Sequence, residues 1–462
     1  MGDNEMLWGG RFSAGPSDEM LRLTASTEID MALLDCDARA TKAHARVLVR
    51  AGLLAPGDLE SIDAVLDDLV VAWRAGEVTA GPRDEDVHSV IERTLTERLG
   101  ELGARIHAGR SRNDLVAQDL RLWCRDAADG LLRRLGALLE AIAARAEEHA
   151  STLMPGFTHL QPAQPVTVGY HLLAHGFALA RDGNRLRVAR TAADVSALGA
   201  GALAGTTLPL DATVAAEELG CAGVFENAMD AVSDRDFACD LVYATATLGV
   251  HLSRLAEEIV QWTSPMWGFA RLPDEWSTGS SMMPQKRNPD MAELVRGRAA
   301  APIGELTSLL TLLKGLPLAY DRDLQEDKAY VFRAVDRASG CIEGTTAMVT
   351  GITFDEERLA STAELGGSWA TDLAELLVTR GLPFRTAHEV AGRLVAHLEN
   401  SGEKLSARLL EEHHELLAAS DLESLSAARS VEARKSHGGP APGRLAEQID
   451  SLRRESLELG AG

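Results

Sequence analysis

The stretch LVYATATLGVHLSRLAEEIVQW, residues 241–262, carries the pattern that decides the fold. Its apolar side chains recur at alternating steps of four and three residues, which places them on one narrow face of a helix. Similar stripes begin at Leu131 and at Ile303. Narrow stripes on long helices are typical of helices that pack nearly parallel in a bundle. The stripes are Leu241, Thr245, Leu248, Leu252, Leu255, Ile259 and Trp262; Leu131, Leu135, Leu138 and Ile142; and Ile303, Leu306, Leu310 and Leu313.

Strand signals are weak, because aromatic residues make up only 4% of the chain and β-branched residues show no repeated alternation between turns. We therefore predict an all-α fold with a central long-helix bundle. Breaks in the helical pattern divide the chain into three expected helical domains. These are residues 1–108, residues 109–361, which contain a polar loop at 278–289, and residues 362–462.

Two segments interrupt the long helices. Pro155–Pro165 contains three prolines, and because proline lacks a donor and fixes φ, this segment predicts loop or extended chain. The polar loop ends in a favourable helix start, with Asn288 as the expected N-cap and Pro289 as the first helical residue.

Composition limits the possible partners and the location. A formal net charge of −23 argues against nucleic acid and against an anionic membrane surface, since both require a basic face. The N-terminal residues do not resemble a signal peptide, and no apolar run approaches the ~18 residues of a membrane span. The five cysteines are scattered and form no C-x-x-C pair, which favours reduced thiols. A cytoplasmic location is therefore expected.

The polar loop is the first candidate for chemistry. Ser280, Ser281, Lys286 and Arg287 lie on a glycine-containing segment that leads into a helix N-terminus. Backbone donors, two cations and the helix dipole suit an anion there. The same field would favour an alkoxide and so activate a serine as base or nucleophile. A flexible charged surface loop is the alternative interpretation of this segment taken alone.

Histidines give weaker signals. His159 lies in the proline-rich segment, where a histidine titrates near neutral pH but is usually just solvated. His171 and His175 are four residues apart and share one helix face, which is compatible with a metal pair. No third ligand or H-E-x-x-H pattern accompanies them in the sequence, so we interpret them as structural and predict no metal.

Taken together, these segments resemble a known family. Gly279–Pro289 (GSSMMPQKRNP) is similar to the signature loop of the fumarase/aspartase superfamily, and this motif is specific. Further segments resemble the argininosuccinate lyase branch of that superfamily, in chain order from residue 7 to beyond 390. They are Leu7–Phe12, Glu85–His88, Gly109–Asp114, Gly156–Pro165, Asp321–Lys328 and Pro383–Glu389.

The resemblance implies an activity and the residues that carry it. The expected reaction is the reversible elimination of fumarate from argininosuccinate, which releases L-arginine. Ser280 matches the base that removes the Cβ proton of the succinyl part, and His159 the acid that protonates the leaving nitrogen. Glu293 matches a carboxylate that pairs with the histidine, and Lys286 would stabilise the charge that develops on the neighbouring carboxylate.

The resemblance also implies a set of substrate-binding residues and an assembly. It implies a homotetramer with a twenty-helix core, active sites each shared between three subunits, no metal and no organic cofactor. The expected substrate-binding residues are Ser26, Asp30, His88, Ser111, Arg112, Asn113, Thr158, Asn288, Tyr320, Gln325, Lys328 and Arg235.

Three alternatives stay open at this point. One is another fumarate-releasing lyase of the superfamily, such as adenylosuccinate lyase, fumarase or aspartase. The second is a non-catalytic, crystallin-like structural homologue, against which the presence of His159, Ser280, Lys286 and Glu293 argues. The third, a plain helical interaction scaffold, leaves the signature loop unexplained.

Overall fold

The computed structural model describes residues 17–81 and 84–460, so the Leu7–Phe12 motif lies outside the described residues. The chain is mainly helical and forms two compact units. One contains residues 1–131, 185–246 and 301–337, and the other residues 132–184, 247–300 and 338–462. We call them the first and the second unit. The three predicted domain boundaries remain a prediction.

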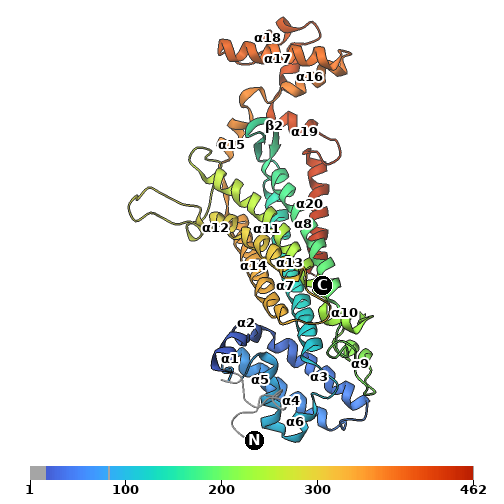
Figure 1. Ribbon diagram of the computed structural model, residues 1–462. Coiled ribbons are helices and arrows are strands. Elements are labelled where there is room, and N and C mark those ends of the chain that lie inside the picture. The colour runs from blue at the N-terminus through green and yellow to red at the C-terminus, as the bar shows by residue number, and fades with distance from the viewer. Residues whose placement is uncertain (1–16, 82–83, 461–462) are drawn as a thin grey trace. The chain divides into compact units, whose positions relative to one another are not determined.

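Five long helices are labelled in Figure 1, and all of them except α13 contribute several turns to each unit. Their lengths agree with the narrow apolar stripes that predicted a bundle. These helices are α7 (Arg112–Glu148), α8 (Val168–Ala193), α11 (Asp236–Thr263), α13 (Ala300–Leu313) and α14 (Asp327–Gly351).

The first unit has its core among the helices that precede α7. Buried apolar side chains between Leu33 and Ile106 form one cluster, in which α3 packs against α4 and α5. The unit also contains the following elements. They are α1 (Asp18–Thr24), α2 (Thr27–Asp30), η2 (Met31–Leu33), α3 (Leu34–Arg50), α4 (Asp58–Arg74), α5 (Val87–Leu99), α6 (Glu101–Arg105), α9 (Ala212–Glu218), α10 (Ala228–Ser233), η4 (Arg322–Glu326) and the parallel strands β3 (Val195–Ser196) and β4 (Gly223–Val224).

In the second unit, glycines allow the long helices to approach closely. A Cβ at Gly176 of α8 would lie 2.5 Å from Leu452, and a Cβ at Gly136 of α7 would lie 3.0 Å from the carbonyl oxygen of Ser456. Both contacts are made by α20 (Pro442–Gly460), which runs beside α8 in Figure 1. A larger residue at either position would push α20 outward.

The second unit also contains a hairpin and a small helical cluster. Apolar residues between Trp369 and Leu425 form that cluster, with α16 packed on α17. The elements are β1 (Leu153–Thr158), β2 (Gln161–Thr167), β5 (Ala270–Arg271), η3 (Asp274–Trp276), α12 (Asp290–Arg298), β6 (Thr353–Phe354), α15 (Glu356–Ala363), η5 (Leu365–Gly367), α16 (Ala370–Thr379), α17 (Phe384–Ser401), α18 (Ala407–His413), η6 (Ala419–Ser424) and α19 (Ala427–Ala433).

Two of the three predicted stripes are buried within the single chain, and the third is partly exposed there. The stripes on α7 and α11 are buried throughout, at 0–3% exposure. On α13, however, Ile303 and Leu310 are 47% and 52% exposed, while Leu309 and Pro302 are buried instead. Periodicity identifies an apolar face, but it does not say which neighbour covers that face.

One local prediction, extended chain in the proline-rich segment, is confirmed, and another, the start of α12, needs correction. The proline-rich segment forms an antiparallel hairpin of β1 and β2, with a register irregularity between Pro155 and Phe157. Helix α12 begins at Asp290 with Pro289 as its N-cap, one residue later than predicted. The reason is that Asn288 is extended, because its N–H and C=O both pair with the backbone of Thr278.

Among the described residues, no helix is both long and apolar enough to cross a membrane.

Candidate active site

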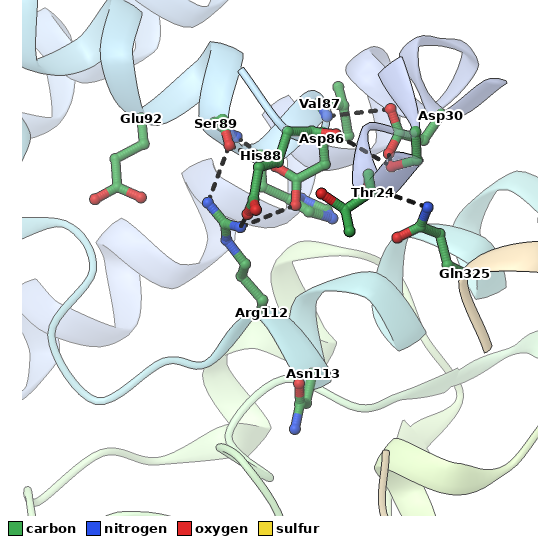
Figure 2. A network of polar contacts seen from close by, with 12 residues as sticks. Thr24, Asp30, Asp86, Val87, His88, Ser89, Glu92, Arg112, Asn113 and Gln325 are labelled. Carbon is green, nitrogen blue, oxygen red and sulfur yellow. Dashed lines mark hydrogen bonds and ion pairs between the residues drawn. The ribbon is translucent and has the colours of Figure 1, made fainter. Parts of the chain in front are cut away.

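The first unit gathers many of the predicted binding residues around the N-terminus of α5 (Figure 2). Asp86 is the N-cap of this helix, and its carboxylate accepts the Ser89 N–H at 2.8 Å and the Ser89 hydroxyl at 2.7 Å. Asp30 accepts the Val87 N–H at 3.2 Å and the hydroxyl of Ser26. The start of the helix is therefore satisfied by side chains from two segments.

Arg112 joins α7 to this cluster. Its guanidinium donates to Glu85 at 2.9 Å and to the Ser89 hydroxyl at 3.0 Å, and lies 3.2 Å from Asp86 (Figure 2). A planar guanidinium can hold several acceptors at once, which fixes its orientation. Arg112 is thus held in place by the neighbouring Glu85–His88 segment.

His88 is buried and lies between two buried carboxylates. Its Nδ1 is 2.5 Å from Asp37 and 3.6 Å from Asp119. Burial lowers the pKa of His88, but the charge of Asp37 and its hydrogen bond outweigh burial and raise the pKa above the ordinary value. Burial, with the nearby Asp37 charge, raises the pKa of Asp119, whose two oxygens have no hydrogen-bond partner among the described residues.

The two carboxyl groups of this cluster differ in their partners. A carboxyl group that is buried without a partner favours its neutral form. Asp119 is biased in that direction, while Asp37 lies 2.5 Å from the His88 ring. The ring of His88 is held by this contact and not by solvent.

The turn before α7 places two further predicted residues. The Ser111 hydroxyl accepts the Asn113 N–H at 3.2 Å, and the Asn113 amide donates to the Ala202 carbonyl at 3.1 Å. Asp114 accepts the N–H groups of Ser111, Gly199 and Gly201. Burial raises the pKa of Asp114 to about 6, against the lowering effect of these donors. Asp114 ties the backbone of Gly199 and Gly201 to the start of α7.

Asp327 organises a second group in the first unit. It accepts from Arg235 at 2.5 Å and from Lys328 at 2.8 Å, and all three side chains are buried. Burial raises the pKa of Asp327, but the charges of Lys328 and Arg235 prevail and hold it below its ordinary value. Arg235 was predicted to bind substrate, but its Nε is already committed to Asp327.

Tyr320 and Gln325 lie on the segment that leads to Asp327. Ala319, the residue before Tyr320, has a φ of 70°, a strained value for a residue with a Cβ. Burial and the charge of Asp327 raise the pKa of the half-buried Tyr320. Gln325 donates to the Thr24 carbonyl at 3.2 Å, which ties this segment to α1 (Figure 2).

In the second unit, His159 lies at the tip of the β1–β2 hairpin. His159 and Leu160 form its two-residue loop, and both have a φ of 56°. Two consecutive positive φ values correspond to a type I′ turn, which normally selects Asn-Gly because residues with a Cβ are strained there. Thr158 and His159 are exposed. The hairpin thus presents an imidazole on a strained turn, a feature found at functional sites.

The signature loop projects from the helices before α12 (Figure 1). The Ser280 hydroxyl oxygen accepts N–H groups from Met282 at 3.3 Å and Met283 at 3.1 Å. Thr278 and Asn288 pair through their backbones at the base of the loop. The backbone donors expected at Ser280 are therefore present, and they are the groups that stabilise an oxyanion.

Arg287, one of the two cations expected near Ser280, binds other groups. Arg287 donates to Asp274 and, at 2.7 Å, to the Leu272 carbonyl, so it holds the loop and does not face Ser280. Lys286 and Glu293 are exposed. Within the described residues of this single chain, no hydrogen bond or ion pair joins Glu293 to His159. The expected pairing of these two residues stays a prediction.

Sequence reasoning missed the buried acids that hold the predicted residues. Asp37, Asp119 and Asp327 are all 0% exposed. Asp119 follows an apolar run and Gln118 on α7, and a charged residue on a helical core face is the signal that could have found it. Asp327 lies inside the Asp321–Lys328 motif, but the resemblance implies roles there only for Gln325 and Lys328.

Solved structures of similar fold define the class of protein. The chain aligns with a crystal structure of EDDS lyase in complex with formate at a TM-score of 0.82 and 28% identity, over 96% of this chain and 90% of that one. A class II fumarase from Schistosoma mansoni aligns at 0.76 and 16% identity, over 93% and 94% of the two chains. The fold is therefore that of the fumarase/aspartase-like lyases.

Sequence comparisons give the family within this class. Residues 10–304 match the family model described as Lyase, and residues 367–432 match the one described as Argininosuccinate lyase C-terminal. The argininosuccinate lyase of Frankia casuarinae is 50% identical over 97% of both chains. That of Mycolicibacterium smegmatis is 47% identical over 99% of both. The chain belongs to the argininosuccinate lyase family.

Proposed function

We infer that this chain catalyses the reversible elimination of fumarate from argininosuccinate, which releases L-arginine in arginine biosynthesis. Relatives that are 50% and 47% identical over nearly the full chain are named argininosuccinate lyase. The observation that carries the chemistry is at Ser280, whose hydroxyl oxygen receives two backbone N–H groups. A serine that receives donors in this way can hold the negative charge of an alkoxide.

In this proposal, Ser280 removes the proton from the succinyl Cβ. The electron pair forms the fumarate double bond as the bond from Cα to the guanidino nitrogen breaks. His159 delivers the proton that the leaving nitrogen needs. Glu293 pairs with His159 and holds its ring for this transfer. Exposure of His159 at a turn tip supports the role, since the imidazole can reach a substrate there.

The carboxylates of the succinyl part need fixed donors. Proton removal next to a carboxylate builds a second negative charge on that group, so donors must be placed where the charge develops. Lys286, Asn288 and Thr158 supply such donors from the second unit. Ser111, Arg112 and Asn113 supply them from the first unit. The hold on Arg112 by Glu85 and Ser89 supports a preorganised contact.

The arginine part of the substrate carries both charges and needs both kinds of partner. We assign it to the residues around α5 and η4, because carboxylates, a cation and amide groups lie together there. Arg235 acts through Asp327, which also holds Lys328. The residues assigned to this part are Ser26, Asp30, His88, Tyr320, Gln325 and Lys328.

The working enzyme in this proposal is a homotetramer with each active site shared between three subunits. The exposed Ile303 and Leu310 on α13 support it, since an apolar stripe on a long helix needs a cover. A second copy of the same helix offers a complementary stripe by symmetry. Assembly would also bring His159, Ser280 and Glu293 from different chains to one substrate.

The test is fumarate release, followed by ultraviolet absorbance, when the purified protein meets argininosuccinate. Ser280→Ala and His159→Asn are run beside the wild type, with adenylosuccinate, malate, aspartate and EDDS as comparison substrates. We expect fumarate from argininosuccinate alone, and its loss in both variants. No fumarate from argininosuccinate with an intact, folded tetramer would refute the proposed activity, and release from a comparison substrate would redirect it.

A further inference from the structure

A second group of chemically active side chains lies in the second unit, on α8 and α11. The Nε2 atoms of His171 and His175 lie 2.5 Å and 2.8 Å from the same oxygen of Glu258. The three ligand atoms all lie within 4.8 Å of one another. The sequence offered no third ligand for the histidine pair because Glu258 is more than eighty residues away. The structure supplies it from a neighbouring helix.

We propose that His171, His175 and Glu258 form a binding site for a divalent transition metal of the zinc class. Histidines at i and i+4 present two nitrogens on one helix face, and a carboxylate opposite completes three of four tetrahedral positions. In such a site the ligand atoms are about 3.4 Å apart, given metal–nitrogen bonds of about 2.1 Å. Each histidine nitrogen reaches this spacing from the Glu258 oxygen when the two atoms separate by less than about 1 Å.

Exposure and charge fit this use. The three side chains are 13–33% exposed, so an ion can enter and a water molecule can take the fourth position. The Glu258 carboxylate accepts from both histidines through one oxygen, so a single anionic group already faces both ring nitrogens. The cation Arg296 is paired with Glu257. Glu257 and Glu258 are consecutive residues of α11, so their side chains do not lie on the same face of the helix.

The surroundings hold one ring of the site in place. The Trp262 ring meets the His171 ring edge-on, with centroids 5.3 Å apart. A ring fixed by packing loses less freedom when it binds an ion. His171 lies in the first turn of α8, directly after β2, so a bound metal joins the base of the His159 hairpin to α11.

The test measures metal binding directly and does not use fumarate release, so it stands apart from the proposed lyase activity. Untagged wild-type protein, freed of metal by a chelator and dialysed, is titrated with cobalt(II) and with zinc. Calorimetry gives the stoichiometry, the visible spectrum of cobalt gives its coordination, and thermal unfolding gives the shift in Tm. The variants are His175→Asn and Glu258→Gln.

His397→Asn is the matched control. His397 and His413 form another pair of close rings, with centroids 5.3 Å apart, but they belong to no three-ligand group among the described residues. Circular dichroism of each variant shows whether it folds. If His175→Asn fails to fold, Glu258→Gln carries the test alone, because it keeps the shape of the side chain.

We expect one ion per chain, a cobalt spectrum of four or five ligands and a higher Tm with zinc. Affinity falls about tenfold or more in His175→Asn and Glu258→Gln, and is unchanged in His397→Asn. Binding of equal strength in the wild type and Glu258→Gln would overturn the proposal. So would the absence of any stoichiometric binding to the folded wild type.

Discussion

The candidate residues of the first unit and those of the second unit are held in place in opposite ways. Around α5 in the first unit, His88, Asp37 and Asp30 are buried, and each makes contacts with other side chains. In the second unit, His159 is exposed on a turn and Ser280 is held by backbone donors alone. The proposed substrate-binding groups are thus held by contacts with other side chains, while the proposed proton-transfer groups depend on the conformation of the backbone.

This contrast separates stability from catalysis. A buried ion pair that loses one partner leaves an uncompensated charge in the interior. An exposed serine that loses its hydroxyl leaves no buried group without a partner, so the free energy of unfolding changes little. Changes in the first unit should therefore act on folding, and changes at the hairpin tip or signature loop on the rate.

The largest effect on folding is expected at Asp327. Asp327→Ala leaves Arg235 and Lys328 buried without their shared carboxylate, which should cost about 3–5 kcal/mol in the free energy of unfolding. Urea unfolding followed by circular dichroism measures the loss. Asp323→Ala, at an exposed position of the same segment, is the control and should change stability by less than about 0.5 kcal/mol. Equal midpoints for the two variants would contradict the assignment.

Ser280→Ala should act on the rate alone. We expect kcat to fall by about 10²–10⁴-fold, the usual contribution of a positioned base, with the urea midpoint unchanged. The neighbouring Ser281→Ala serves as control and should keep more than a tenth of the rate. Steady-state kinetics on argininosuccinate checks both variants. If Ser281→Ala is the dead variant, the base is misassigned by one residue.

The ion pair of His88 and Asp37 predicts a pH dependence of stability. Because the pKa of His88 is raised in the folded protein, its contribution is complete below the ordinary pKa of about 6.5. That contribution is lost as the pH rises through the folded pKa. The stability difference between wild type and His88→Asn should therefore be larger at about pH 6 than at about pH 9. A difference that grows with pH would mean that His88 is neutral.

The smallest effect is expected at the hairpin tip. Leu160 is 63% exposed with a φ of 56°, so Leu160→Gly relieves strain and loses little packing. We expect up to about 1 kcal/mol more stability than in Leu160→Ala, which keeps the strain. Thermal unfolding compares the pair. A Tm for the glycine variant below that of the alanine variant would show that the turn is not strained.

Sequence reasoning succeeded where the signal was local or where a motif was long. The stripes on α7 and α11 are confirmed because a repeating apolar face on a long helix has few other uses. Ser280 was found together with its backbone donors, since the glycine-containing loop already indicated an anion site. The same reasoning placed Arg287 beside Ser280, but a charge is attracted to its nearest partner, which here is Asp274.

The sequence by itself determined the helical class, the loop that carries Ser280 and the family to which the chain belongs. Only the tertiary structure decided which charges are satisfied inside the protein. Asp37 meets His88, and Glu258 meets His171, across separations of 51 and 87 residues. Contacts of that kind depend on how helices pack and not on any repeat along the chain. The strained turn under His159 was hidden for a related reason, because hairpin pairing fixes its backbone and neither His nor Leu favours that conformation.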